Sequence, residues 1–221
     1  MRYQTAPHSD KLIIIDRKIA LFTGSGIFLS QSASPQQNTQ PRQSIPPILF
    51  FLYRTLKMKL KILVGSMTHT AKHVAQAIQM ECADLANPVE VEPMDGLDIS
   101  VFDADKTEDV LYLICTSTYG AGDVPDNAQA LYQSLDLQPR FLGHVRYGVI
   151  ALGDSASHAQ TFCFGGKHFD ERLQDLGAQR IGEICCLDSS DGTLPETVGA
   201  EWCRQWLQAA LPKSSAPCDA T

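Results

Sequence analysis

The chain has 221 residues, a length that suits one domain or one domain plus an appendage, and its composition of 44% hydrophobic and 19% charged residues is that of a globular protein. Its formal net charge of −7 is unevenly distributed, because residues 1–57 carry a net charge of +5 and residues 58–211 carry −12. The acidic body argues against nucleic acid as a ligand, since nucleic-acid binding depends on clustered basic residues, and it favours electrostatic attraction of basic protein partners.

Residues 1–57 differ from the rest of the chain and are expected to be a disordered or mis-annotated extension. Two apolar patches near the start are broken by Asp16, Arg17 and Lys18, so they are too short and too charged to span a membrane. The stretch that follows, SQSASPQQNTQPRQSIPP, is too polar to fold alone. We expect translation to start at Met58, with an expressed targeting or anchoring segment as the alternative.

Strands and helices alternate from residue 59 to residue 211, and residues 212–221 are expected to form a disordered tail. Apolar runs predict strands over residues 60–65, 89–91, 111–115, 147–152 and 180–187. Amphipathic patterns predict helices over residues 71–86 and 125–137, one that ends at Gly177, and one over residues 195–211. This order predicts an α/β fold in which a five-stranded, doubly wound parallel sheet has helices on both faces.

The first candidate binding loop, SMTHTA, follows the first predicted strand and runs directly into a helix. Backbone N–H groups at a helix start, together with the hydroxyls of Ser66, Thr68 and Thr70, can bind phosphate without a basic side chain. The alternative is plain N-capping, because Ser and Thr are favoured at helix starts in any case.

The second candidate loop, TSTYGAGDVPDN, follows the apolar run over residues 111–115. Gly120 and Gly122 allow the backbone to approach a ligand closely, while Tyr119 supplies a flat face and Asp123 a charge. The alternative is an ordinary glycine-rich turn with a surface tyrosine. A third loop, GDSASHAQTFCF, follows the strand predicted over residues 147–152, so three loops meet at the carboxyl ends of the strands.

The cysteines and histidines do not predict a disulfide framework or a metal site. The seven cysteines are odd in number, include no C-x-x-C pair and lie mostly within apolar patterns, at positions 82, 115, 163, 185, 186, 203 and 218. We therefore expect buried free thiols and a reducing, cytoplasmic location. The six histidines show no zinc-binding spacing, so no metal is predicted.

These three loops resemble, in order and spacing, the FMN-binding loops of flavodoxins. The resemblance is closest to the MioC-type short-chain flavodoxins and to the flavodoxin-like FMN domain of diflavin reductases, and it covers residues 59–211. It implies a flavodoxin-like sheet with the strand order 2-1-3-4-5 and FMN as the cofactor. The extension before Met58 has no counterpart in the family.

The resemblance also implies which residues bind FMN, and it implies no catalytic residue. The phosphate group would be held by Ser66, Met67, Thr68, His69, Thr70 and Ala71. One face of the isoalloxazine ring would be lined by Ser117, Thr118, Tyr119, Gly120, Ala121, Gly122 and Asp123, with the Tyr119 ring stacked on it. The other face would be lined by Leu152, Gly153, Asp154, Ser155, His158, Phe162 and Cys163.

Two positions depart from the family pattern. The family usually has Gly at the position of His69, where a side chain would strain the turn or screen the phosphate, unless it is a tolerated surface histidine. The family's second stacking tyrosine is absent from a segment that is about two residues longer here. His158 is the nearest planar substitute, and the alternative is a solvent-exposed loop histidine.

The function that the resemblance implies is that of an FMN-binding electron-transfer protein, which shuttles electrons between a reductase and an acceptor protein. We expect a monomer with basic redox partners, no membrane span and no nucleic-acid ligand. One alternative is an NAD(P)H-dependent quinone reductase of the same fold, although no G-x-G-x-x-G fingerprint is present. The other is a flavin-free binding module on this fold, because fold alone does not establish function.

Overall fold

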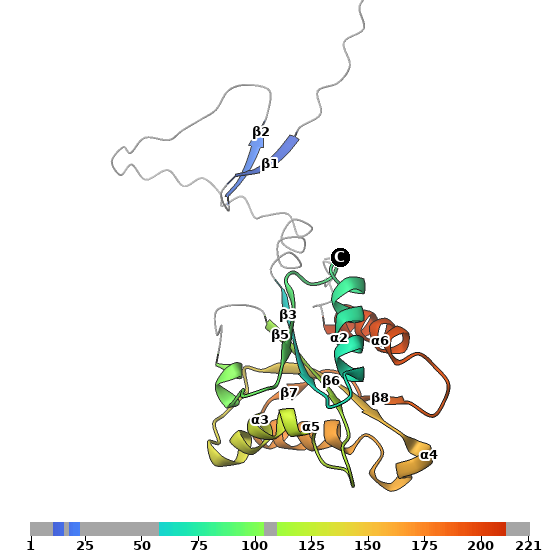
Figure 1. Cartoon of the computed structure of the whole chain (residues 1–221). Coiled ribbons are helices and arrows are strands. Elements are labelled where there is room, and N and C mark those ends of the chain that lie inside the picture. Colours follow the sequence, from blue (N-terminus) through green and yellow to red (C-terminus); the bar gives the residue numbers. More distant parts are fainter. Residues whose placement is uncertain (1–10, 16–17, 23–57, 104–109, 211–221) are drawn as a thin grey trace, which may run out of the picture. The chain divides into compact units, whose positions relative to one another are not determined.

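The computed structural model describes residues 11–15, 18–22, 58–103 and 110–210 (Figure 1). The chain divides into two units, Met1–Ser44 and Ile45–Thr221. In the first unit, β1 (Lys11–Ile15) and β2 (Lys18–Phe22) pair as an antiparallel hairpin, which the sequence analysis did not anticipate. The tail expected over residues 212–221, and most of the extension expected over residues 1–57, lie outside the described residues.

The second unit is built on a parallel sheet with the order β4-β3-β5-β6-β7, and β8 also pairs with β6. This is the predicted strand order 2-1-3-4-5, because β7 and β8 together replace the single fifth strand that was expected over residues 180–187. The strands are β3 (Lys59–Gly65), β4 (Val89–Pro93), β5 (Val110–Ser117), β6 (Arg146–Gly153), β7 (Gln179–Arg180) and β8 (Cys185–Asp188).

Helices cover both faces of this sheet (Figure 1). The long helices are α2 (Thr70–Glu81), α3 (Asp126–Leu137), α5 (Phe164–Asp175) and α6 (Pro195–Ala210). The short ones are α4 (Ser155–His158) and the 3-10 turns η1 (Ile99–Phe102) and η2 (Ala159–Thr161). Among the described residues, no helix is long and apolar enough to cross a membrane.

The core has two layers because side chains alternate along each strand. Leu111 and Leu113 of β5 pack on the side of α2 and α6, whereas Tyr112 and Ile114 pack on the side of α3 and α5. All four side chains are buried. A strand that is buried on both faces reads as a continuous apolar run, which is why the sequence predicted this strand well.

Candidate functional site

The three loops predicted to bind the cofactor leave the sheet side by side. Parallel pairing places Gly65, at the end of β3, opposite Thr116, and Ser117, at the end of β5, opposite Leu152 of β6. Because these strand ends are level, the loops that follow them are neighbours. The backbone N–H and the hydroxyl of Thr118 both donate to the Leu152 carbonyl oxygen, at 2.9 and 3.0 Å, which joins the second loop to the third.

A cavity of about 320 Å³ lies where the loops meet. Ten of the predicted site residues line it: Thr68, Thr70, Ser117, Thr118, Gly120, Leu152, Gly153, Asp154, His158 and Phe162. Apolar side chains such as Leu152 and Phe162 are thus combined with hydroxyl groups such as those of Thr68 and Thr70. This combination suits a flat ring that carries a polar tail.

Four further residues line the cavity and were not predicted: Thr161, Leu187, Ser189 and Pro195. Leu187 lies in β8, Ser189 directly follows this strand, and Pro195 is the first residue of α6. The sequence did contain a signal for them, because β8 ends at the same side of the parallel sheet as β3, β5 and β6. The loop that follows a fifth parallel strand should have been included in the crevice.

The first loop has the features of an anion site. The Ser66 hydroxyl is buried and has no hydrogen-bond partner among the described residues. Helix α2 begins after His69, whose side chain makes no capping hydrogen bond, so the N–H groups of its first turn are not capped by a side chain. The hydroxyls of Thr68 and Thr70 lie 3.2 Å apart at this helix start. A phosphate oxygen would satisfy both the orphan hydroxyl and the uncapped N–H groups, so these residues fit the phosphate of FMN.

His69 occupies a backbone conformation that favours glycine. Its φ angle is +67°, in the left-handed region, and its side chain is exposed. The expected strain at this turn is therefore present in the structure. The His69 side chain lines a second, open groove beside the loop and does not line the cavity between the loops.

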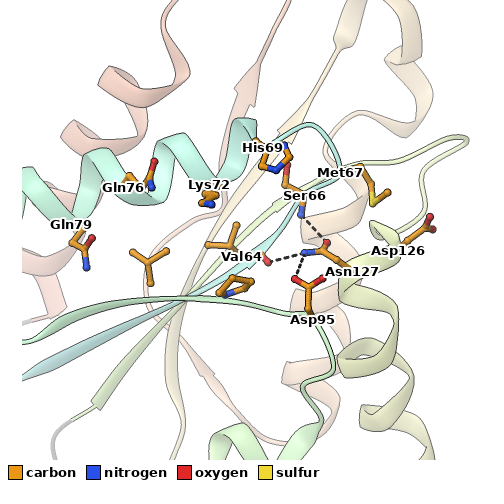
Figure 2. A pocket seen from close by; sticks show the side chains of 12 residues that line it. Val64, Ser66, Met67, His69, Lys72, Gln76, Gln79, Asp95, Asp126 and Asn127 are labelled. Carbon is orange, nitrogen blue, oxygen red and sulfur yellow. Dashed lines mark hydrogen bonds between the residues drawn. The ribbon is translucent and has the colours of Figure 1, made fainter.

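Asn127, at the start of α3, fastens the first loop (Figure 2). Its amide oxygen accepts a hydrogen bond from the backbone N–H of Ser66 at 2.9 Å. Its amide nitrogen donates to the Val64 carbonyl oxygen at 3.4 Å and to the Asp95 carboxylate at 3.2 Å. The sequence analysis did not single out Asn127, because nothing in the sequence shows that its side chain meets a loop 61 residues away.

The groove drawn in Figure 2 has a volume of about 720 Å³ and is larger than the cavity between the loops. Long polar side chains of α2, including Lys72, Gln76 and Gln79, contribute to its lining. Three predicted site residues, Ser66, Met67 and His69, also line it. The smaller cavity is lined by residues of all three predicted loops.

The second loop is a tight turn that exposes its tyrosine. Tyr119 and Asp123 exchange two backbone hydrogen bonds of 2.8 and 2.9 Å, and the Tyr119 side chain is 50% exposed. Gly120 and Gly122 have positive φ angles of +54° and +120°. A Cβ atom at Gly122 would lie 3.1 Å from the Cβ atom of Thr161, so the absence of a side chain there lets the second loop approach the third.

The third loop is held by two carboxylates. The Asp154 side chain caps α4 by accepting from the N–H groups of Ala156 and Ser157 at 3.0 and 3.1 Å, and hydrogen bonding by Ser157 lowers the pKa of Asp154. Asp188 accepts from the N–H of Ser155 at 3.1 Å and from the hydroxyl of Ser190 at 2.7 Å. Hydrogen bonds from these two serines lower the pKa of Asp188 below its usual range.

Seven predicted site residues line neither the cavity between the loops nor the groove beside the first loop: Ala71, Tyr119, Ala121, Gly122, Asp123, Ser155 and Cys163. For Cys163 the reason is clear, because its side chain is fully buried and its thiol donates to the Ala151 carbonyl oxygen at 3.2 Å. Its thiol therefore lies in the core and not on the cavity wall. Tyr119 and Asp123 are exposed at the surface of the second loop.

Among the described residues, no group of three or more His, Cys, Asp or Glu side chains could hold a metal ion. The cavity, its hydroxyl groups and the start of α2 can bind and orient a phosphorylated, flat ligand.

The sequence pattern of the flavodoxin family matches residues 62–202. Flavodoxin YqcA from Escherichia coli is 46% identical over 99 residues, which are 45% of this chain and 65% of YqcA. The sulfite reductase [NADPH] flavoprotein alpha-component from Vibrio cholerae is 38% identical over 151 residues, which are 67% of this chain and 23% of that protein. The chain thus spans less than two thirds of either relative.

A solved structure gives a longer match. A cysteine-to-alanine mutant of the flavodoxin from Pseudomonas aeruginosa has 33% sequence identity and a TM-score of 0.58. The match covers 69% of this chain and 98% of that flavodoxin.

Proposed function

The chain belongs to the flavodoxin family of FMN-binding electron-transfer proteins, and from this premise we propose that it carries electrons between a basic reductase and an acceptor protein. Residues 58–211 would form the FMN-binding domain, and the protein would act as a monomer. The observation that carries the proposal is a cavity lined by all three loops beside the uncapped start of α2.

We infer that the phosphate of FMN lies at the first loop. There the Ser66 hydroxyl, the hydroxyls of Thr68 and Thr70 and the first N–H groups of α2 would donate to its oxygens. The isoalloxazine ring would lie in the cavity between the second and third loops, against Leu152 and Phe162. His158 lines this cavity, which supports the proposal that its ring contacts the flavin in place of the missing tyrosine.

When bound, FMN can accept and release electrons one at a time. The role of the protein residues is to bind the cofactor, exclude water from one side of the ring and leave an edge open to a partner. The exposed second loop, which carries the Tyr119 ring and the Asp123 carboxylate, suits the open side. The Asp123 carboxylate, on a domain whose residues 58–211 carry a net charge of −12, would attract a basic partner to this side of the protein.

The absorption spectrum of the purified full-length protein tests this proposal. We expect a yellow protein with a flavin band, and an apoprotein that binds FMN more tightly than riboflavin by about tenfold or more, because charge-assisted hydrogen bonds contribute about 1.5–3 kcal/mol each. A colourless protein that does not bind added FMN would contradict it. Steady-state oxidation of NAD(P)H by the protein alone would instead indicate a reductase.

The Ser66→Ala variant separates binding of the phosphate from binding of the ring. Because the Ser66 hydroxyl is buried without a partner in the described structure, its removal should not destabilise the apoprotein. The same change should weaken the affinity for FMN and leave the affinity for riboflavin unaltered. Equal losses for the two ligands would place the phosphate elsewhere.

A further inference from the structure

Two cysteines from different elements meet at one residue of β6. Cys186, in β8, pairs in register with Ala151 of β6. Cys163, the residue that precedes α5, donates its thiol to the carbonyl oxygen of the same Ala151 at 3.2 Å. The strand register and the hydrogen bond therefore place both cysteines beside Ala151.

Strand alternation puts both thiols on one face. Cys185 and Leu187 are buried in the core layer of α2 and α6, so Cys186, which lies between them, points to the opposite face. Cys163 belongs to the core layer on that opposite face. The two side chains differ in accessibility, because Cys186 is exposed whereas Cys163 is fully buried.

The surroundings of the pair separate the roles of the two thiols. The neighbouring Cys163 thiol and the Lys167 ammonium lower the pKa of Cys186 to about 6, against the opposing effect of partial burial. The neighbouring Cys186 sulfur, burial and the charge of Cys186 raise the pKa of Cys163, with Lys167 and Asp188 as the other charged groups that act on it. These opposite shifts favour the thiolate at the exposed sulfur and the protonated thiol at the buried one.

We propose that Cys186 and Cys163 form an oxidation-sensitive thiol pair that reacts with low-molecular-weight disulfides. The Cys186 thiolate attacks one sulfur of the disulfide RSSR, which forms a mixed disulfide and releases the thiolate RS⁻. Cys163 then loses its proton, and its sulfur attacks the Cys186 sulfur, which forms the Cys163–Cys186 disulfide and releases the second RS⁻. In total, two protein thiols are oxidised and one RSSR is reduced to two RSH.

A second cysteine pair in the chain provides a matched control. Cys82 and Cys203 also interact directly, and hydrogen bonding by Cys203 lowers the pKa of Cys82. Both of these side chains are fully buried, however, so neither sulfur can be reached by an added disulfide. The combination of a stabilised thiolate with exposure to solvent therefore distinguishes Cys186 from Cys82.

Alkylation tests the thiolate. The full-length protein, as purified and in a Cys218→Ser background that removes a thiol outside the described residues, is reacted with iodoacetamide at graded pH and analysed residue by residue by mass spectrometry. We expect Cys186 to react first, with a rate that levels off above about pH 7, whereas an ordinary thiol with a pKa of about 8.5 would continue to gain rate. A Cys186 rate that still rises steeply through pH 8.5 would overturn the proposal.

Oxidised glutathione tests the pairing. The wild-type pair should give an intramolecular product, found as a peptide that links residues 163 and 186, and Cys186→Ser should give neither this product nor a mixed disulfide at the pair. Cys163→Ser should stop at the mixed disulfide on Cys186. Accumulation of that mixed disulfide in the wild-type protein would refute the pair, as would formation of a Cys82–Cys203 link at the same rate. The wild-type measurements decide the question even if Cys163→Ser fails to fold.

Discussion

The side-chain oxygen of Asn127 accepts a hydrogen bond from the backbone N–H of Ser66 at 2.9 Å. The second residue of α3 thus holds the first residue of the proposed phosphate loop. The same side chain donates to the Val64 carbonyl oxygen at the end of β3. Asn127 therefore links the end of one strand, the loop that follows it and a helix that begins after the neighbouring strand. The position of the Ser66 hydroxyl depends on this link.

Asn127→Ala should therefore weaken FMN binding without contact between Asn127 and the cofactor. A loss of about tenfold in affinity is expected, because each lost hydrogen bond contributes about 0.5–1.5 kcal/mol. Titration of the apoprotein with FMN, followed by flavin fluorescence, measures the effect. Gln133→Ala is the control, since the exposed Gln133 lies on the same helix and its side-chain amide donates to the Gln129 side-chain oxygen at 3.5 Å. Equal affinities for the two variants would contradict this role.

His69→Gly should leave the fold stable, because glycine adopts the φ angle of +67° without the cost of about 1–2 kcal/mol that other residues pay in the left-handed region. The midpoint of thermal unfolding should stay the same or rise. In contrast, His73 lies at an exposed position inside α2, so His73→Gly should lower the free energy of unfolding by about 1 kcal/mol. A larger loss for His69→Gly than for His73→Gly would show that the His69 side chain stabilises the turn.

Electron transfer to a basic partner should slow as ionic strength rises, since about 0.15 M salt reduces the range of exposed charges to about 8 Å. Asp123→Lys is the local test, because Asp123 is exposed on the second loop, whereas Asp154 caps α4 and Asp126 is in the first turn of α3. At low salt this reversal should lower the second-order rate more than Glu81→Lys, at the opposite end of α2 from the loops. Similar rates for both variants would mean that only net charge matters.

Acid should destabilise the third loop through Asp188. Hydrogen bonds in the folded state lower the pKa of Asp188, so the unfolded chain binds the proton first as pH falls below about 4. The stabilisation is complete above that pH and is lost as pH falls toward the folded-state pKa. Thermal unfolding between pH 3 and 7 should therefore show a weaker pH dependence for Asp188→Asn than for the wild type. Glu183→Gln, at a highly exposed position, should follow the wild-type curve.

Removal of residues 1–57 should leave FMN binding and the midpoint of thermal unfolding nearly unchanged. The hairpin of β1 and β2 forms its own two-stranded sheet, and the large sheet begins with β3 at Lys59. The truncated chain should keep Met58, because this residue is buried in the core layer of α2 and α6. A large fall in the unfolding midpoint would show that the boundary of the domain lies further upstream.

The strands and their order could be predicted because apolar runs and loop motifs are local signals. The strand expected over residues 180–187 was wrong in one respect, since it is divided into β7 and β8. Gly182, with a φ angle of +72°, lies in the interruption, and the Trp206 indole donates to the Ile181 carbonyl oxygen there at 2.8 Å. This contact joins positions 25 residues apart, so the local pattern could not reveal it.

The candidate site was predicted less completely than the fold. Its loops were located correctly at the strand ends, but the orientation of individual side chains depends on contacts between distant segments. Cys163 lies next to Phe162 in the sequence, yet only Phe162 lines the cavity, because Cys163 is buried beneath Ala151. The motif therefore predicted a loop that lines the cavity, and it could not distinguish the residues of that loop that face the cavity from those that face the core.

The division of the last strand also affects how the sheet meets other chains. A long, flat edge strand is a template for pairing with foreign strands, but β7 has two residues and β8 has four. At the other edge, β4 carries Glu90 and Glu92, which pair with Lys59 and Lys61 of β3 at 2.9 and 2.6 Å, and it ends at Pro93. Short strands at one edge, and charges with a proline at the other, are features that disfavour edge-to-edge pairing of the sheet with other chains.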